Sequence, residues 1–176
     1  RLPKTPFPLI DGSMKRRSFI QQACGLSLCL PAFARSAGTP YLGQIGLQLY
    51  TLRKAIAEDL KKTLGEVAKI GYRQVEPYGF PSPQSIDMIK RAKDLGMRVH
   101  SSHFTWDSLL HPEKKGMRPF AEVLETAREH ELTDLVVPYL HNEDRKDLEA
   151  YKKTAETLNR GAELSAEAGI RLAYHN

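Results

Sequence analysis

At 176 residues the chain has room for one domain of ordinary size, and its 41% hydrophobic and 27% charged content is typical of a globular protein. The net charge of +5 arises near the N-terminus: residues 1–34 hold five basic side chains and one acid, which leaves 21 basic and 20 acidic residues in the rest. This neutral balance argues against a nucleic-acid surface, and the lack of an apolar run of about 18 residues argues against stable membrane insertion.

The N-terminal segment has the pattern of an export signal. Residues 14–19 read Met-Lys-Arg-Arg-Ser-Phe, and a weakly apolar stretch and a small-residue Ala32-x-Ala34 site follow. We therefore predict that residues 1–13 precede the start codon at Met14, that residues 14–34 form a twin-arginine signal peptide, and that residues 35–42 form a linker. The export machinery would then be a partner, and the protein would be periplasmic or secreted. A basic tail on a cytosolic protein is the alternative. Both cysteines, Cys24 and Cys29, lie inside this signal, so the mature chain would have no thiol nucleophile.

Strands and helices alternate along the remaining chain. Hydrophobic patterns predict strands at residues 44–51, 74–77, 97–102, 134–137 and 170–174. They predict helices at residues 59–71, 82–96, 119–130 and 144–168, the last as one long helix or a broken pair, with a polar loop at 103–116. This alternation is typical of an α/β fold with a parallel sheet.

Two architectures fit the alternation. One is the N-terminal part, about five β/α units, of an eight-fold (β/α)8 TIM barrel, spanning residues 43–176. The other is a complete five-stranded doubly wound domain, which normally has a helix after its last strand and a glycine-rich first turn. Residues 50–55 contain no glycine, and the last predicted strand has no helix after it, so the barrel is favoured.

Polar side chains gather where the predicted strands end. In a β/α barrel these ends form the rim of the pocket, so together they predict a mouth suited to a hydroxyl-rich ligand. The residues are Gln48, Tyr50, Glu76, Tyr78, Ser102, His103, Tyr139, His141, His175 and Asn176.

Each candidate has a structural alternative. Glu76 and His103 are the candidate catalytic residues. For Glu76 the reason is that an acid at a buried strand end is costly unless it is paired or bound to a metal. The structural alternative for Glu76 is a pair with Arg73. His111 and His141 are expected to be solvated loop residues. The candidates for substrate contact are Gln48, Tyr50, Tyr139, His175, Asn176 and, as a stacking platform or lid anchor, Trp106.

Four segments together resemble the sugar phosphate isomerase/epimerase family, the xylose isomerase-like barrels. They are Ile-Gly-Leu-Gln-Leu-Tyr-Thr-Leu-Arg at 45–53, Gly-Tyr-Arg-Gln-Val-Glu at 71–76, Ser-Ser-His at 101–103 and Tyr-His-Asn at 174–176. The resemblance implies an isomerase that moves a proton between adjacent carbons of a sugar, sugar phosphate or related polyol. It also implies a divalent metal (Mn, Mg, Co or Zn) with ligands mostly beyond residue 176, and a possible homo-oligomer. Within this chain, it implies pocket positions for Gln48, Glu76, His103 and His175.

Three other interpretations stay open. The chain could be an exported, non-catalytic carbohydrate-binding barrel, or an inactive fragment with open sheet edges at its first and last strands. A zinc endonuclease of the same superfamily would share the strand-end histidine His103, but the near-neutral charge of residues 35–176 argues against a DNA substrate.

Overall fold

The computed structural model describes residues 45–175, which belong to one compact unit, Gly38–Asn176. The segments predicted at 1–13, 14–34 and 35–42, and Asn176, lie outside the described residues. The described strands are β1 Leu47–Gln48, β2 Val75–Glu76, β3 Ser101–His103, β4 Asp134–Val137 and β5 Arg171–Tyr174. The helices are α2 Arg53–Glu58, α3 Leu60–Ile70, α4 Pro83–Asp94, α5 Asp107–Leu110, α6 Phe120–Glu129 and α7 Leu148–Glu167, with 3₁₀ turns η1 Leu49–Leu52 and η2 Glu143–Arg145.

The described strands are parallel and lie side by side in chain order. β1 pairs with β2, and β3 pairs with β4, which pairs with β5. Two single bridges, Gln74 to Arg98 and Phe80 to Phe104, join the segments around β2 and β3. A doubly wound sheet reverses its strand order at the switch point, whereas a barrel wall runs in sequence. The doubly wound alternative is therefore wrong for the described residues, which form an α/β unit consistent with part of a TIM-like barrel.

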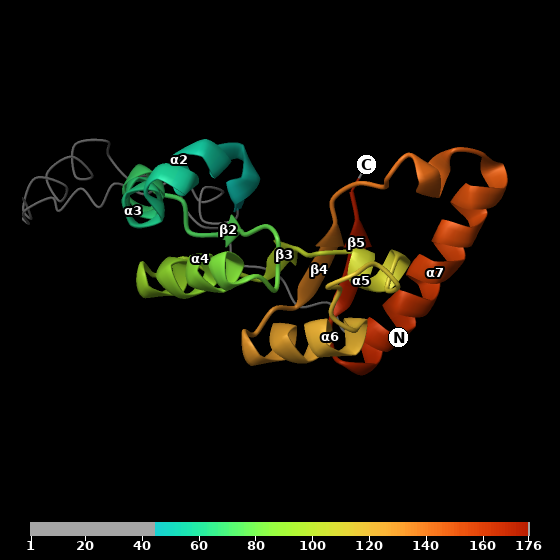
Figure 1. Cartoon of the computed structure of the whole chain (residues 1–176). Helices are drawn as coiled ribbons and strands as arrows, with labels where there is room; N and C mark the ends of the chain where they lie inside the picture. The colour runs from blue at the N-terminus through green and yellow to red at the C-terminus, as the bar shows by residue number, and fades with distance from the viewer. Residues whose placement is uncertain (1–44, 176) are drawn as a thin grey trace, which may run out of the picture. The chain divides into compact units, whose positions relative to one another are not determined.

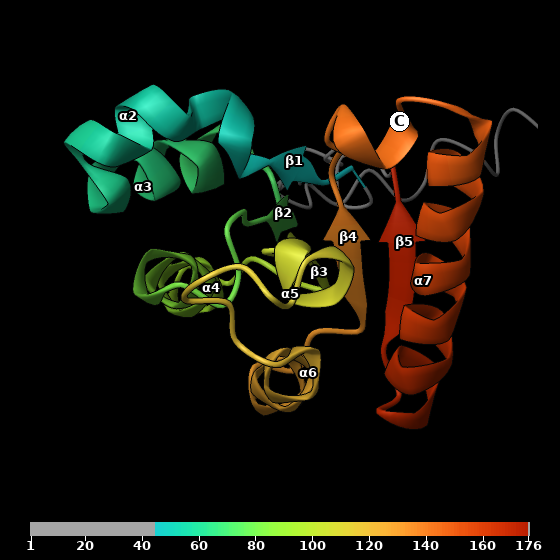
Figure 2. The ribbon, with the colours of Figure 1, turned by 45° about the vertical axis from the view of Figure 1, so that its right-hand side comes forward.

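The helices follow one another around the outside of the strands (Figures 1 and 2), and local sequence sets their ends. The Asp59 side chain accepts a hydrogen bond from the Lys62 backbone N–H at 2.8 Å and so caps α3. Gly71 ends that helix with φ of 113°, a left-handed conformation that favours glycine. Ser82 caps α4 in the same way as Asp59 caps α3, with Pro83 in the first turn.

The structure differs from the sequence prediction in three segments. The strand expected at residues 97–102 is β3, Ser101–His103, preceded only by the single bridge of Arg98 to Gln74. The strand expected at residues 44–51 ends at Gln48, because the Gln48 side chain accepts a hydrogen bond from the Tyr50 N–H and turns the chain into η1. Helix α2 follows η1 and buries Ile56. The loop expected at 103–116 holds the short helix α5, and His103 belongs to β3.

Alternation along the strands separates the core from the opposite side of the sheet. Val75, Leu135 and Val137 are fully buried in the cluster that packs against α3, α4 and α6, and each such side chain contributes about 1.5–3 kcal/mol. The intervening residues, including Glu76, His103 and Asp134, project from the other side, where the polar contacts described below gather.

The Asp134–Arg171 pair on β4 and β5 predicts acid sensitivity of the fold. Burial raises the pKa of Asp134, but contacts with Arg171, at 2.5 Å, and Thr133 outweigh it, so the pKa lies below the ordinary value. A lowered carboxyl pKa stabilises the fold above the unfolded-state pKa of about 4, and this contribution is lost as pH falls through the folded-state pKa. Asp134→Asn should cost about 1 kcal/mol at pH 7 and much less near pH 3 in urea unfolding.

The matched control is Glu125→Gln, which changes an exposed carboxylate on α6. It should leave the free energy of unfolding nearly unchanged at both pH values. An equal cost of Asp134→Asn at pH 7 and pH 3 would contradict the assignment of its stability to the ion pair.

A close approach of α7 to α5 predicts a second stability effect. A Cβ at Gly161 would lie 2.5 Å from Leu109 Cδ2, while a Cβ at Gly65 in α3 meets nothing within 4 Å. Gly161→Val should therefore destabilise the fold by roughly 2 kcal/mol through overpacking. Gly65→Ala should instead stabilise it by about 0.5–1 kcal/mol, because alanine favours helix. Thermal unfolding of both variants checks the opposite signs, and a stabilising Gly161→Val would show that α5 does not pack there.

Candidate active site

The Glu76 carboxylate lies at the end of β2 beside a histidine from β3 and a serine that donates to it. His103 Nε2 is 3.1 Å from Glu76 Oε1, an ion-pair distance, and the Ser101 hydroxyl donates to Oε2. The Glu76 side chain is 23% exposed. Burial raises the pKa of Glu76, but the contacts with His103 and Ser101 outweigh burial and leave the pKa below its usual value. Glu76 is therefore ionised at neutral pH and has lone pairs left for a ligand.

The proton position on His103 follows from its neighbours. The Tyr50 backbone N–H donates to Gln48 Oε1 at 2.5 Å, so the other end of that amide, Nε2, faces His103 Nδ1 at 3.2 Å. An amide nitrogen only donates, so Nδ1 accepts and the ring proton sits on Nε2, toward the carboxylate. Gln48 thus holds His103 in the tautomer that places an N–H beside Glu76.

The backbone of β3 fixes the position of His103. Its N–H donates to the Pro77 carbonyl, and its carbonyl accepts from the Phe80 N–H, both at 3.0 Å. The His103 and His175 rings, from β3 and the end of β5, have centroids 5.3 Å apart. Residues from the ends of β2, β3 and β5 therefore meet at this pair of imidazoles.

A cavity of about 640 Å³ opens beside His103 at the carboxyl ends of the strands. Its size is that of a small-molecule site, and its lining is mostly aromatic. The lining residues are Tyr50, Tyr78, Gly79, His103, Phe104, Thr105, Trp106, Asp107, Pro138, Tyr139, His141 and His175. A hollow of about 710 Å³ lies against α7, but it is lined by loop and helix residues and contains no strand end.

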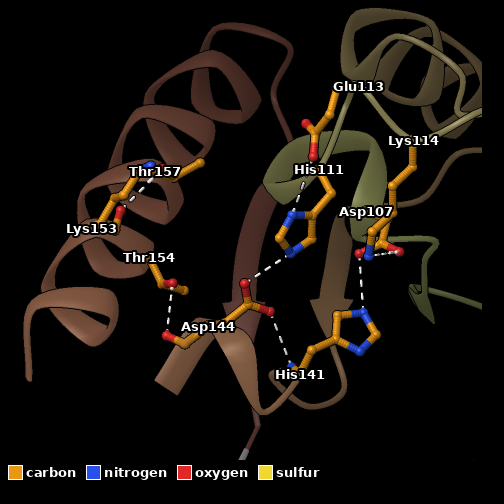
Figure 3. A network of polar contacts seen from close by, with 9 residues as sticks. All are labelled: Asp107, His111, Glu113, Lys114, His141, Asp144, Lys153, Thr154 and Thr157. Atoms are coloured by element: carbon orange, nitrogen blue, oxygen red, sulfur yellow. Dashed lines mark hydrogen bonds and ion pairs between the residues drawn. The ribbon is translucent and has the colours of Figure 1, made fainter. Parts of the chain in front are cut away.

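Two histidine–carboxylate pairs tie the loops around the cavity together (Figure 3). His141 Nε2 lies 3.1 Å from Asp107 Oδ1, and His111 Nε2 lies 2.8 Å from Asp144 Oδ1. The expectation that both histidines are solvated is wrong: their side chains are 26% and 19% exposed, respectively. Each pair joins the segment after β3 to the segment after β4, so the pairs fix the rim of the cavity.

The structure brings most of the sequence-predicted residues to one place. Gln48 and Glu76 do not line the cavity but contact His103, one from each side. Asn176 lies outside the described residues. The predicted residues that line the cavity are Tyr50, Tyr78, His103, Trp106, Tyr139, His141 and His175.

Sequence reasoning missed two residues of the site, Ser101 and Asp107. Ser101 precedes His103 by two positions on a strand and so projects from the same side, which is a signal that the sequence offers. Asp107 lies in a segment whose short helix has no clear pattern in the sequence. Only the fold brings Asp107 to His141.

Within residues 45–175, no three histidine, cysteine or acidic side chains gather in a way that could hold a metal ion. Glu76 and His103 are adjacent, but the described residues add no third ligand at that point. These residues by themselves do not fit a divalent metal. In the same part of the chain, no helix has the length and apolar character needed to cross a membrane.

Comparison with known proteins finds similarity among solved structures. No protein-family model matches the sequence, and no curated protein matches it. Among solved structures, the chain is similar to a sugar phosphate isomerase/epimerase from Parabacteroides distasonis, with 30% sequence identity and a TM-score of 0.52. The match covers 75% of this chain and 50% of that one, so the chain spans half the length of the structure that it resembles.

Proposed function

We propose that the protein is an isomerase or epimerase that moves a proton between adjacent carbons of a sugar or related polyol. The observation that carries the proposal is the ionised, partly exposed Glu76 carboxylate, held by His103 and Ser101 beside a cavity of small-molecule size. The similarity to a solved sugar phosphate isomerase/epimerase supports the same class of reaction.

Glu76 is the general base in this proposal; it does not itself line the cavity, so the substrate must extend past His103 to reach its carboxylate, which is 23% exposed. Its carboxylate takes a proton from the carbon next to the carbonyl of the substrate, which leaves an enediolate and a neutral carboxylic acid. The acid then returns the proton to the neighbouring carbon, while a second proton passes from the hydroxyl oxygen to the former carbonyl oxygen. A carboxylate with a depressed pKa is ionised before the substrate binds, which the first transfer requires.

His103 and Gln48 act through Glu76. The Ser101 hydroxyl donates to one carboxylate oxygen, His103 Nε2 lies at ion-pair distance from the other, and Gln48 holds the imidazole in the required tautomer. We therefore assign Gln48 a positioning role. Tyr50, Trp106, Tyr139 and His175 line the cavity and supply rings and polar groups for the substrate.

The proposal extends to the rest of the protein. Residues 43–176 would form about five β/α units of an eight-fold barrel, carried through the twin-arginine machinery to the periplasm or beyond and possibly joined as a homo-oligomer. A divalent metal (Mn, Mg, Co or Zn) belongs to the proposal, with ligands from outside residues 45–175. The steps above use none of its chemistry.

A substrate panel tests the function. The protein, loaded in turn with each metal, is incubated with ketoses, aldoses and keto-sugars, and the products are separated by chromatography. We expect interconversion of at least one pair and loss of the activity with a chelator. Binding of sugars without any conversion would instead support the carbohydrate-binding barrel, and the lack of both would overturn the proposal.

A further inference from the structure

The outer part of the cavity is built from stacked and crossed rings. The Trp106 and His141 rings stack with an interplanar angle of 27° and centroids 5.3 Å apart. Tyr139 crosses the Trp106 ring at 72° with centroids 4.4 Å apart. Tyr139 is half exposed. Aromatic faces of this kind suit the apolar face of a sugar ring better than they suit a strongly hydrated anion.

This outer part contains two acceptor groups, Asp107 and His141, and a donor, the buried Trp106 Nε1–H, which has no partner among the described residues. Asp107 accepts from His141 Nε2 through Oδ1 and from Lys114 Nζ through Oδ2, at 3.1 and 3.0 Å. A carboxylate has about four lone-pair sites, so two remain for a ligand. Because His141 donates through Nε2, Nδ1 of the neutral ring is an acceptor. A sugar hydroxyl can donate to both groups, whereas a phosphate dianion only accepts and is repelled by Asp107.

The nearby cations are engaged elsewhere. Lys114 is paired with Asp107, and Arg53 lies 4.5 Å over the Tyr50 ring and donates to the Tyr50 carbonyl at 3.0 Å. Neither cation lines the cavity, and none of the described residues that do is lysine or arginine. The described part of the cavity thus lacks the charged fork or ammonium group that binds phosphate.

We infer that Asp107 and His141, with Trp106, form a specificity subsite that takes an unphosphorylated, hydroxyl-rich ring and disfavours its phosphate ester. This inference rests on the proposed function and narrows its substrate class. Asp107 and His141 accept hydrogen bonds from ring hydroxyls while the ring stacks against Trp106. Asp144 supports the subsite by accepting from the His141 backbone N–H at 3.1 Å (Figure 3).

Fluorescence of Trp106 tests the inference directly, because it is the only tryptophan in the sequence. The probes are matched pairs: fructose with fructose 6-phosphate, and xylulose with xylulose 5-phosphate. We expect at least one free sugar to bind roughly tenfold or more tighter than its ester. Equal or tighter binding of the esters, or no response to any probe, would overturn the inference.

Two variants with opposite expected effects separate charge from misfolding. Asp107→Asn removes the repelling charge and releases Lys114, so the preference for the free sugar should fall to about threefold or less. Lys114→Met leaves Asp107 unneutralised, so the preference should grow. Glu131→Gln, a carboxylate change at an 81% exposed side chain paired with Lys93, should leave the preference unchanged. Equal ratios in all three variants would also overturn the inference.

The same samples keep the inference separate from the proposed function. Conversion of phosphate esters together with tight binding of these esters would support the isomerase function and contradict the proposed subsite. Selective binding of free sugars without conversion of any sugar would support the subsite and contradict the isomerase function.

Discussion

Replacing Glu76 with glutamine is expected to lower kcat for sugar conversion by roughly 10³-fold, with a small effect on KM. The amide keeps the shape of the side chain but cannot accept a proton from carbon, and general-base catalysis typically contributes 10²–10⁴-fold. Steady-state kinetics on the substrate found by the panel measure both constants. A separate binding titration is expected to show nearly unchanged affinity for the sugar.

The matched control is Glu131→Gln, the same chemical change at an exposed carboxylate that pairs with Lys93. It should keep kcat within about twofold of the original value, since surface ion pairs of this kind contribute little. A Glu76→Gln variant that retains kcat would exclude Glu76 as the base.

Replacing His103 with leucine is expected to lower kcat by roughly 10²-fold at neutral pH and to move the acidic limb of the pH–rate profile toward higher pH. After burial, which raises the pKa of Glu76, the contact with His103 is the largest influence on it, and this contact lowers it. Without His103 the pKa rises, so a larger fraction of the base is protonated at a given pH. The pH dependence of kcat/KM measures this shift.

The variant His103→Gln distinguishes loss of the contact that positions Glu76 from a general loss of packing at residue 103. A glutamine offers an N–H donor to Glu76, so this variant should recover part of the rate and move the acidic limb back toward lower pH. An acidic limb that is the same in both variants and in the original protein would contradict the role of His103 as the group that holds Glu76 ionised.

Much of the fold could be predicted because its signals are local. Asp59 and Gly71 bracket α3, Ser82 begins α4, and the apolar run at residues 134–137 is a strand with the same bounds as predicted. The short elements η1, α2 and α5 could not be predicted. η1 depends on a side-chain contact of Gln48, and α5 depends on packing of Leu109 against Gly161.

The candidate site shows the same division. Polar residues at strand ends indicated where Glu76, His103 and His175 would meet, since parallel strand ends share one edge of the sheet. The sequence could not show that Gln48 contacts His103 rather than the cavity, because that depends on the turn made by η1. It also could not show that His111 and His141 are paired with Asp144 and Asp107, residues 33 and 34 positions away in the chain.

Exchange of carbon-bound hydrogen with solvent is a direct measure of proton transfer by Glu76. The metal-loaded protein is incubated with the sugar panel in D₂O, and deuterium at the carbons next to the carbonyl is followed by NMR. If Glu76 transfers the proton, deuterium enters the sugar in the presence of the original protein and of Glu131→Gln, but not in the presence of Glu76→Gln. Incorporation that persists in Glu76→Gln, or conversion of a sugar without any exchange in the original protein, would contradict proton transfer by Glu76.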